Sequence, residues 1–579
     1  MIKIIKRIWF HLNRSHKKSL LGLFLLMILS SFAEFLSIAS IFPFIAIFLN
    51  PEGLKNSSFS FIFDQLQLDD KQLFFLITVL FVSSVFLAGV LRVLSLWLQT
   101  RFSHNVGTDF SNDIFRKTLY QPYQVHILRN SSEVIAGIAR KADYLVYSAM
   151  MPLLSILSSG FLFFGIVTAL ISLNPFAVLI SFGVLGSVYG VVIFITKKRL
   201  SFYSQVASEM QNSVYKVVQE GLSGIREILL GNLQELYVRE HKRADRPVRR
   251  VGGNIIIIGQ SPRFIIETFA LVTLACVTYA ISQDGDLELN AYIPLIGALG
   301  LGAQRLLPLA QQIYVSYSGF RGGQASICDA LELLDQEVSR KLESHDISFE
   351  SGIHFKDVSF QYQGSSNEAL ENISIEISKG SRVGIIGETG SGKSTFLDIL
   401  MGLLAPTKGE IKIDQEILGE SNLTGWMQQI SHVPQDIYLI DASVMENIAF
   451  GIEKKNINKE RLYTAAKLAC LSETIENMSK GYETQVGERG VMLSGGQKQR
   501  LGIARALYRD TSILIFDEAT SALDTKTEEI VMESIQTHCP GLTLVMVAHR
   551  TTTLKNCDLI LEISGGSIIR KGSYDLICQ

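Results

Sequence analysis

The sequence lacks the marks of a disulfide-stabilised or zinc-binding protein. Its six cysteines are scattered, with no C-x-x-C pair and no histidine at a zinc-site spacing: Cys276, Cys328, Cys470, Cys539, Cys557 and Cys578. A disulfide framework is therefore not expected, and a reducing compartment is favoured for the soluble part. An excess of basic charge is also missing, because the formal net charge is -2 and the isoelectric point is near 6.6. A partner made of nucleic acid is therefore disfavoured.

Apolar residues, by contrast, are abundant. They make up 47% of the 579 residues, and the mean hydropathy is +0.27. Ordinary soluble domains are less apolar, so we expect a membrane part and a soluble part. Six stretches are long enough to cross a bilayer, which takes about 20 helical residues. These stretches are Leu20–Phe48, Leu73–Leu98, Met150–Leu173, Phe176–Ile195, Ile255–Ile281 and Ala291–Tyr317.

The first stretch follows a basic N-terminus. It shows no early cleavage pattern of small residues, so we interpret it as a retained spanning helix rather than a signal peptide. The basic cluster contrasts with the acid-leaning loop 51–70, which predicts a cytoplasmic N-terminus. With an even number of spans, the C-terminus is predicted to be cytoplasmic as well. The basic residues are Lys3, Lys6, Arg7, Lys17 and Lys18.

Polar stretches separate some of these spans. Gln99–Tyr147 and Lys197–Arg250 have helical periodicity, which predicts helices that extend beyond the membrane into the cytosol. Asn174 and Pro175 alone link the third and fourth spans and predict a tight turn. An apolar-rich segment around Phe61 follows the first span. It either lies along the outer membrane surface or packs on the protein as a loop helix.

After Glu343 short β-branched stretches alternate with helical segments. This alternation predicts a mostly parallel sheet covered by helices. The clearest strands are Arg382–Ile386, Ile411–Ile413, Ile513–Phe516 and Thr543–Val547. The predicted organisation is an all-α polytopic membrane domain of six transmembrane helices over residues 1–320, a linker over 321–350, and an α/β P-loop domain over 351–579.

Residues 387–395 fit the pattern G-x-x-x-x-G-K-[ST] between an apolar strand and a helical stretch, the setting of a phosphate-binding loop. Glycines let backbone N–H groups approach phosphates, and the helix start adds a favourable dipole. Lys393 would supply positive charge to the β- and γ-phosphates, and Ser394 a hydroxyl to Mg²⁺. The candidate nucleotide-binding residues here are Gly387, Glu388, Thr389, Gly390, Ser391, Gly392, Lys393, Ser394 and Thr395.

Two carboxylates, Asp517 and Glu518, follow the apolar strand Ile513–Phe516. At the end of that strand they would emerge beside the phosphates. Asp517 can hold the hydration shell of Mg²⁺, and Glu518 can polarise the attacking water. Taken alone, such a pair of acids is as often a solvated loop.

Further motifs occur in a fixed order along the chain. They are Val433-Pro-Gln435-Asp436, Leu493-Ser-Gly-Gly-Gln497, Ser521-Ala-Leu-Asp524 and Val547-Ala-His549-Arg550. Together with the P-loop and the paired acids, they make the region from about Ile353 to the C-terminus resemble an ATP-binding cassette domain. The whole chain resembles the exporter-type half-transporters of that family, in which a membrane domain precedes the cassette.

The resemblance implies roles for matching residues within one cassette. Glu518, His549 and Gln435 would be catalytic, with His549 contacting the γ-phosphate. Gln435 would also contact Mg²⁺, together with Ser394 and Asp517. Tyr362 occupies the place of an aromatic residue that stacks on adenine. ATP and Mg²⁺ are therefore the expected cofactors.

The resemblance also implies a dimer. Ser494, Gly495, Gly496 and Gln497 resemble the signature that closes over the γ-phosphate of ATP on the other subunit, and Asp524 resembles a cross-dimer loop residue. Residues 484–490 resemble a segment that meets the cytoplasmic helices of the membrane domain. Because one chain has one P-loop and one signature, two chains are required. A homodimer is expected to hydrolyse ATP at both sites, and a heterodimer with a related chain stays open.

Three arginines fall within or near the predicted spans. With about 1.5 Å per helical residue, Arg263 and Arg305 lie near mid-span and Arg92 near the inner end of its span. A charged side chain at bilayer depth costs free energy, so contact with a substrate is the default hypothesis for these arginines. Their forked hydrogen bonds would suit a phosphate or pyrophosphate. The structural alternative pairs Arg263 with Glu267 four residues later, neutralises Arg92 with Glu34, or lets Arg92 snorkel to the interface.

The membrane part also resembles lipid-linked oligosaccharide flippases of the PglK type. The likeness lies in Ser31-Phe-Ala-Glu34-Phe, Phe42-Pro-Phe44-Ile, Ser261-Pro-Arg263 and Gln304-Arg305-Leu-Leu-Pro308, with the apolar segment near Phe61. In that family the arginines bind a lipid pyrophosphate, and the outer helix contacts the polyprenyl tail. Gln312 stands where the family has a further basic residue, which weakens the pyrophosphate argument.

The predicted function is ATP-driven export or flipping of a lipid-linked substrate across the cytoplasmic membrane of a bacterium, with a polyprenyl-pyrophosphate oligosaccharide as the preferred cargo. The alternatives are a multidrug, lipid A or peptide exporter of the same fold. A soluble cassette ATPase and a regulatory, channel-type cassette protein are more remote. The sequence leaves the cargo open.

Overall fold

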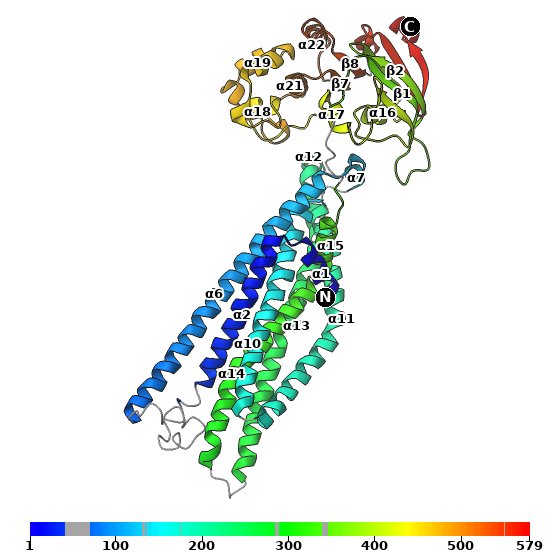
Figure 1. Ribbon diagram of the computed structural model, residues 1–579. Helices are drawn as coiled ribbons and strands as arrows, with labels where there is room; N and C mark the ends of the chain where they lie inside the picture. The colour runs from blue at the N-terminus through cyan, green and yellow to red at the C-terminus, as the bar shows by residue number, and fades with distance from the viewer. Residues whose placement is uncertain are drawn as a thin grey trace. The chain divides into compact units, whose positions relative to one another are not determined.

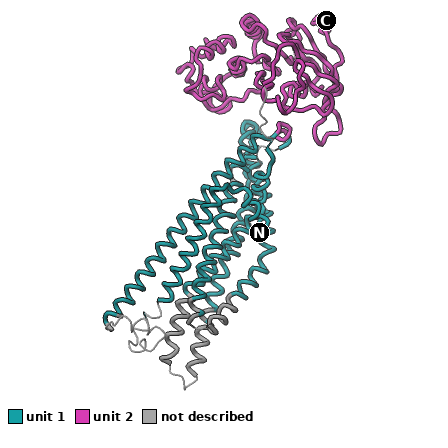
Figure 2. The backbone as a smooth tube through the Cα atoms, viewed as in Figure 1, with its two compact units in different colours: residues 1–121, 128–338 teal, residues 122–127, 339–579 magenta. Residues whose placement is uncertain are grey.

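A computed structural model of the chain describes residues 1–40, 44, 70–129, 134–135, 137–173, 175–283, 289–338, 346–520, 522–548 and 550–578. The chain forms two compact units (Figure 2). Unit 1 comprises Met1–Gln121 and Leu128–Val338, and unit 2 comprises Pro122–Ile127 and Ser339–Gln579. The predicted domain boundaries stay predictions, and the apolar segment near Phe61 lies outside the described residues.

Unit 1 is built of helices in its described part (Figure 1). The short η1 and η2 are wider π-helical turns that lead into α10. In chain order the helices are α1 (Ile2–His11), α2 (Arg14–Ala39), α6 (Asp70–Leu119), η1 (Gly137–Lys141), α9 (Ala142–Tyr144), η2 (Leu145–Met150), α10 (Met151–Leu173), α11 (Pro175–Ser223), α12 (Ile225–Leu230), α13 (Gln234–Gln283), α14 (Leu289–Gly322) and α15 (Gln324–Leu334).

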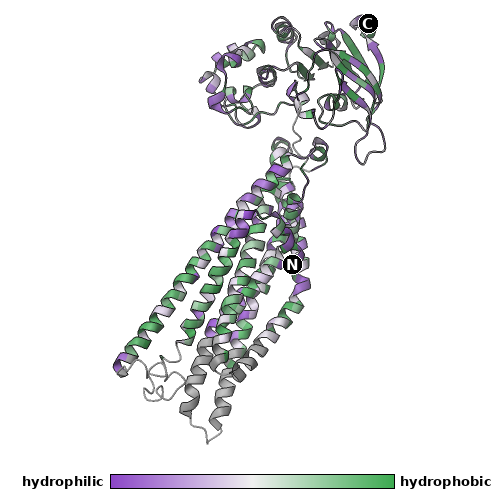
Figure 3. Cartoon of the chain, in the orientation of Figure 1, coloured by the Kyte–Doolittle hydropathy of each residue, from purple (hydrophilic) through white to green (hydrophobic). Residues whose placement is uncertain are grey.

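Three helical stretches among the described residues are long and apolar enough to cross a membrane: Arg14–Ala39, Phe74–Leu119 and Ala142–Thr168. They correspond to the first three predicted spans. Figure 3 shows the hydrophobic residues along α2, and along the first part of α6 before its sequence becomes mixed. The other three predicted spans fall within α11, α13 and α14, where many side chains lie outside the described set, so the number six stays a prediction.

The predicted helical extensions are present, with breaks. α6 continues through the predicted span to Leu119, and α11 continues to Ser223. Phe102, Val106 and Phe110, spaced by four residues, are buried on one face of α6 in a cluster that includes α15. α10 ends at Leu173 and α11 begins at Pro175, a residue whose fixed φ suits the first position of a helix.

The helices pack in a pattern that brings distant parts of the chain together. α2 packs on α6 and α10, and α10 packs on α14. The buried face of α2 includes Met27, Ser31, Glu34 and Ile38, which recur at the three- to four-residue spacing of one helix face. A carboxylate is thereby placed on the packed side of a predicted span.

Unit 2 is the predicted α/β part, and its strands form two sheets. β1 (Gly352–Phe360), β2 (Leu370–Ser378), β4 (Lys408–Ile413) and β5 (Glu416–Ile417) form an antiparallel sheet in the order β2-β1-β4-β5. The second sheet has the order β10-β9-β3-β8-β7-β6. Its strands are β3 (Arg382–Ile386), β6 (Ile430–Val433), β7 (Ile513–Asp517), β8 (Thr543–Val547), β9 (Leu559–Ser564) and β10 (Ser567–Gly572).

In the second sheet β6, β7, β8, β3 and β9 run parallel, and β10 pairs antiparallel with β9. The predicted strands Arg382–Ile386 and Thr543–Val547 are confirmed to the residue, and Ile513–Phe516 is extended by Asp517. Because parallel strands end at one edge of a sheet, the segments that follow β3, β6, β7 and β8 meet there. The predicted phosphate site is built at this edge.

Helices flank the sheets of unit 2. The buried Phe396 of α16 stacks on Phe355 of β1, and Trp426 donates a 2.8 Å hydrogen bond from Nε1 to the carbonyl of Leu400. The helices are α7 (Tyr123–Leu128), α16 (Lys393–Leu400), α17 (Leu423–Gln428), α18 (Val444–Ile448), η3 (Lys454–Asn456), α19 (Lys459–Leu468), α20 (Ser472–Glu476), η4 (Gly481–Glu483), η5 (Glu488–Gly490), α21 (Gly495–Tyr508), α22 (Thr525–His538), η6 (Thr551–Leu554) and α23 (Tyr574–Ile577).

Candidate nucleotide site

The loop between β3 and α16 has the geometry of a phosphate cradle. Gly387, Gly390 and Gly392 have φ values of 153°, 81° and 106°, which side chains other than glycine rarely adopt. A Cβ atom on Gly387 would lie 2.2 Å from the carbonyl oxygen of Ile563. Backbone N–H groups of the loop and the first turn of α16 can therefore face an anion closely.

Lys393 and Ser391 lie inside this loop. Lys393 is 8% exposed and donates hydrogen bonds of 2.8 Å from Nζ to the carbonyls of Gly387 and Glu388. The hydroxyl of Ser391 is buried and has no hydrogen-bond partner among the described residues. A buried hydroxyl without a partner is costly, so the loop fits a ligand with acceptor oxygens such as a phosphate.

Tyr362 lies beside the phosphate loop, as a residue of a nucleotide site should. Its hydroxyl is 3.1 Å from Oγ1 of Thr395, and its ring meets Phe360 edge-on at a centroid distance of 4.9 Å. Thr395 immediately follows Ser394, the predicted Mg²⁺ ligand. The position is compatible with the predicted stacking on adenine, which stays a prediction.

Acidic groups gather where β7 ends. Desolvation and the neighbouring Glu518 raise the pKa of Asp517, while Lys393 acts in the opposite direction. Desolvation, with a contribution from Asp517, raises the pKa of Asp398 on α16 to about 6. Sequence analysis missed Asp398 because it lies on an ordinary helical stretch, where only the fold reveals its proximity to Asp517.

Gln435 and Glu518 are in direct contact. Nε2 of Gln435 donates a 2.6 Å hydrogen bond to Oε2 of Glu518. Glu518 has a φ of 51°, which is uncommon outside glycine and is often found at functional sites. The structure thus joins two of the predicted catalytic residues, whereas His549, the third, lies outside the described residues.

Ser494 begins α21 in a capping box. The Ser494 hydroxyl accepts from the backbone N–H of Gln497 at 3.3 Å, and the Gln497 side chain accepts from the backbone N–H of Ser494 at 2.8 Å. These bonds fix the helix start, so its N–H groups and dipole are ready for an anion. Gly495 and Gly496 pack closely on Ala522, since a Cβ on Gly496 would lie 3.2 Å from its carbonyl oxygen.

The loop after β7 is tied to this helix by a residue that sequence analysis missed. The Gln499 side chain accepts a 2.9 Å hydrogen bond from the backbone N–H of Ala522. Asp524 caps α22 and accepts from the N–H of Thr527 at 2.9 Å and from its hydroxyl at 2.7 Å, and these bonds lower the pKa of Asp524. Gln499 lies two residues beyond the signature, and its spacing alone gave no signal.

The predicted Mg²⁺ ligands are a few side-chain oxygens, from Ser394, Asp517 and Gln435, and not a cluster of acidic residues. Among the described residues no cluster of three histidine, cysteine, aspartate or glutamate side chains could hold a metal. Mg²⁺ usually keeps waters and binds one or two carboxylates with substrate phosphates, so a single Asp517 with the Ser394 hydroxyl fits that chemistry. Where Mg²⁺ binds, Gln435 would face it from the next strand.

In unit 1 the structure gives each predicted substrate arginine an acidic partner. Arg92 and Arg305 each pair with Glu34 at 2.5 Å, and Arg263 pairs with Glu267 at 2.8 Å within α13. The intrahelical pair and the Glu34–Arg92 pair agree with the structural alternative. The Glu34–Arg305 pair was not anticipated, because it joins residues 271 positions apart.

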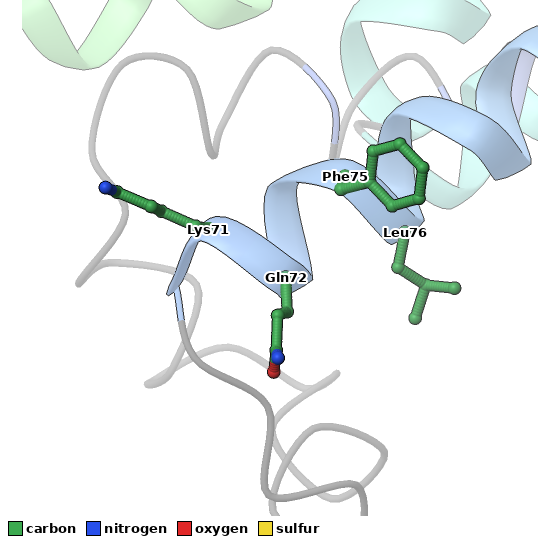
Figure 4. Close-up of a pocket in the computed structure, with 4 residues that line it drawn as sticks. All are labelled: Lys71, Gln72, Phe75 and Leu76. Carbon is green, nitrogen blue, oxygen red and sulfur yellow. The ribbon is translucent and has the colours of Figure 1, made fainter.

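A hollow of about 390 Å³ lies at the start of α6, lined by Lys71, Gln72, Phe75 and Leu76 (Figure 4). Figure 4 shows the polar ends of Lys71 and Gln72 pointing away from Phe75 and Leu76. The polar groups do not converge, so this hollow is not a built ligand site.

Comparison with known proteins gives consistent results. The chain matches the family model for the ABC transporter transmembrane region over residues 20–293 and that for the ABC transporter over residues 370–521. It is 27% identical over 503 residues to the ATP-dependent lipid A-core flippase of Pseudoalteromonas atlantica, covering 86% of this chain and 85% of the relative. The flippase of the same name from Shewanella denitrificans is 29% identical over 493 residues, covering 84% and 81%.

A solved structure shares the fold. The structure of a bacterial Atm1-family ABC exporter with ATP bound superposes with a TM-score of 0.80 at 22% identity, covering 97% of each chain. The fold and both family matches agree with the motifs in unit 2. The chain belongs to the ATP-binding cassette transporters as an exporter-type half-transporter, an integral membrane protein that couples ATP hydrolysis to transport.

Proposed function

We propose that two copies of this chain form the active transporter, with each ATP held by the P-loop of one copy and the signature of the other. Each chain has one P-loop and one signature. Figure 1 shows α21, which carries the signature, and α16, which follows the P-loop, on different sides of unit 2. The capping box at Ser494 leaves its helix start ready for the partner's γ-phosphate. A related chain could replace one copy.

Within each composite site, the residues of this chain have distinct tasks. Lys393 would leave the loop carbonyls to pair with the β- and γ-phosphates. Glu518 would polarise the attacking water while Gln435 holds the carboxylate by its hydrogen bond, and His549 would contact the γ-phosphate. Mg²⁺, held by Ser394, Asp517 and Gln435, would neutralise charge on the phosphates.

The proposed cargo is a lipid with a phosphate-bearing headgroup, and lipid A with its core sugars is the first candidate. The observation that carries this proposal is the similarity to lipid A-core flippases over 86% of the chain. It favours this cargo over the polyprenyl-pyrophosphate oligosaccharide that the sequence motifs in the membrane part suggested. Both lipids carry phosphate, an anion to which the arginines of the membrane part can donate hydrogen bonds.

We place the protein in the inner membrane of a bacterium with the cassette in the cytoplasm, because basic residues precede the first span. ATP binding would draw the cassettes together, and hydrolysis would release them. Differential contact with the nucleotide would then bias the inward- and outward-facing states of the membrane helices.

The test is reconstitution of the purified protein in liposomes. ATPase activity and headgroup translocation are measured with lipid A-core lipid, with a polyprenyl-pyrophosphate glycolipid and with amphiphilic drugs. Stimulation and ATP-dependent translocation of the first lipid are expected. Stimulation by drugs alone would reject the lipid proposal, and preference for the glycolipid would restore the oligosaccharide cargo.

A further inference from the structure

Three helices of unit 1 meet at one buried carboxylate. Glu34 of α2 is 1% exposed, and its two oxygens are shared between two arginines. Oε2 accepts from Arg92 of α6 at 2.5 Å, and Oε1 accepts from Arg305 of α14 at 2.5 Å. We call Glu34, Arg92 and Arg305 the Glu34 triad. Of the carboxylates in the described part of unit 1, Glu34 is the buried one.

The Glu34 triad carries a net charge of +1, because two guanidinium groups share one carboxylate. Arg92 and Arg305 keep 49% and 40% of their side chains exposed, although their common partner is buried. Each donates to Glu34 through a single nitrogen, and a guanidinium has five N–H donors. Exposed N–H donors and a net positive charge therefore remain on Arg92 and Arg305 after both oxygens of Glu34 have accepted a hydrogen bond.

The surroundings explain why the pairing is close. Ile38 of α2, Ile166 of α10 and Leu306 of α14 form a buried apolar cluster, and Glu34 itself is 1% exposed, so little water reaches its carboxylate. In such surroundings an unpaired carboxylate is costly, and a pair of arginines without a carboxylate would repel each other. Glu34 thus offsets the repulsion and holds the two guanidinium groups together.

We propose that Glu34 is a positioning residue that sets the affinity of the membrane domain for the phosphate of a lipid headgroup. Glu34 acts through Arg92 and Arg305, whose exposed N–H groups can donate hydrogen bonds to a phosphate. Its own charge keeps the subsite at +1 rather than +2, which limits affinity and allows the headgroup to leave after transport. The inference rests on the proposed function, since it names how that cargo is recognised.

A purely structural role for Glu34 makes a different prediction. If Glu34 only joined α2, α6 and α14, any substitution that breaks its ion pairs would reduce the stability of the protein. Affinity for anionic and for neutral ligands would then change to the same extent. A charge-setting residue changes affinity for phosphate according to the net charge of the triad. Three variants separate these roles: E34Q has a net charge of +2, R92Q has 0, and the double variant E34Q/R92Q returns to +1.

The experiment uses the full-length dimer in phosphatidylcholine nanodiscs. ATPase stimulation is titrated with lipid A, with undecaprenyl pyrophosphate and with a neutral diacylglycerol. E34Q is expected to lower the half-stimulating concentration of the phosphate lipids by about two- to fivefold, and R92Q to raise it similarly. E34Q/R92Q is expected to lie near the wild type. Comparison of the two phosphate lipids identifies whether monophosphate or pyrophosphate is preferred.

Glu240 provides a matched control. It pairs with Arg243 at the same 2.5 Å distance but on an exposed helix surface, so E240Q removes an equivalent pair away from the triad. E240Q is expected to keep the half-stimulating concentration of the wild type. Thermal melting verifies folding, and should E34Q not fold, R92Q and E34Q/R92Q still test the charge order.

The outcomes distinguish the inference from the proposed function. A wild-type protein that neither phosphate lipid stimulates overturns both. A stimulated wild type overturns the inference alone if E34Q leaves the half-stimulating concentration unchanged, or if the double variant is weaker than R92Q. If the double variant restores the wild-type half-stimulating concentration, the inference is supported. A second substitution would not recover a lost structural contact between the helices.

Discussion

Gln435 donates a 2.6 Å hydrogen bond to Glu518 across two neighbouring strands of the parallel sheet. Gln435 follows β6 and Glu518 follows β7, so the carboxyl ends of adjacent strands bring the two side chains together. The structure thus joins two residues that are far apart in sequence at the carboxyl edge of the sheet.

The first prediction concerns Glu518. E518Q removes the negative charge but keeps the size of the side chain, so polarisation of the attacking water is lost while ATP binding remains. We expect a fall in ATP turnover of at least about 100-fold, the range for loss of a general base. Steady-state ATPase assays measure turnover, and retention of labelled ATP on the dimer measures binding.

A matched control for E518Q is E562Q. Glu562 is a carboxylate of the same sheet that pairs with Arg570 on β10, away from the segments that follow β7. It is expected to retain wild-type turnover. If E518Q still hydrolyses ATP near the wild-type rate, Glu518 does not have the proposed role.

The second prediction compares two capping boxes in unit 2. Ser494 caps α21 and Ser443 caps α18 by the same reciprocal bonds, with Gln497 and Glu446 as their partners. Loss of either serine cap is expected to reduce stability by about 1 kcal/mol. S494A should also lower ATPase activity strongly, because its hydroxyl belongs to the signature, whereas S443A should not.

Chemical unfolding and ATPase assays on the two full-length variants give both quantities. Equal losses of activity in S494A and S443A would mean that the signature serine acts through helix stability alone. A loss confined to S494A supports direct contact with the partner's ATP.

The parts that could be predicted from sequence are those that local pattern determines. The P-loop lies between β3 and α16 because its glycines and flanking apolar strand encode the turn, and Arg263 pairs with Glu267 because four residues make one helical turn. Asp517 followed from the end of a short apolar strand. In each case the interacting residues are close in sequence.

The parts that could not be predicted depend on packing between distant segments. Arg305 reaches Glu34 because α14 and α2 both pack on α10, and no periodicity in either helix specifies that contact. Gln499 bonds Ala522 for a similar reason, since the loop after β7 folds onto α21. The preferred cargo changed from a polyprenyl-pyrophosphate oligosaccharide to lipid A with its core sugars. The motifs in the membrane part are short, whereas the similarity to lipid A-core flippases covers most of the chain.

The third prediction separates the hydroxyl and the ring of Tyr362. Y362F removes the hydroxyl that lies 3.1 Å from Thr395 and keeps the ring. A neutral hydrogen bond contributes about 0.5–1.5 kcal/mol to stability. Because this bond lies within the protein, Y362F should lower the free energy of unfolding by that amount and ATP affinity by about twofold or less. Y362A also removes a stacking surface and should weaken binding further, by about 1–3 kcal/mol for base stacking.

Equilibrium binding of a fluorescent ATP analogue measures both variants. Tyr463, an exposed tyrosine that packs on Tyr482 in unit 2, provides the control Y463A, which is expected to bind ATP normally. Equal affinity for Y362A and wild type would mean that Tyr362 does not stack on the base.

The fourth prediction is a pH dependence caused by Asp398. Desolvation and the nearby Asp517 raise its pKa from 3.8 to about 6. Between these values the folded protein holds a proton that the unfolded chain has lost, so stability falls as the pH rises from about 4 to 6 and stays lower above that window. D398N removes the titration, and it should therefore be more stable than the wild type at pH 7.5.

The expected advantage of D398N at pH 7.5 is about 1–2 kcal/mol, below the full value of the shift because solvent screens the carboxylate. At pH 3 the wild-type carboxyl is protonated in the folded state and largely so in the unfolded chain, so the two proteins should unfold together. Calorimetry of both at the two pH values measures the difference. D510N provides the control, because the side chain of Asp510 is 84% exposed. Its stability should equal that of the wild type at both pH values. An advantage of D398N that is the same at both pH values would show that lost packing or a new hydrogen bond, and not the charge of Asp398, changes the stability.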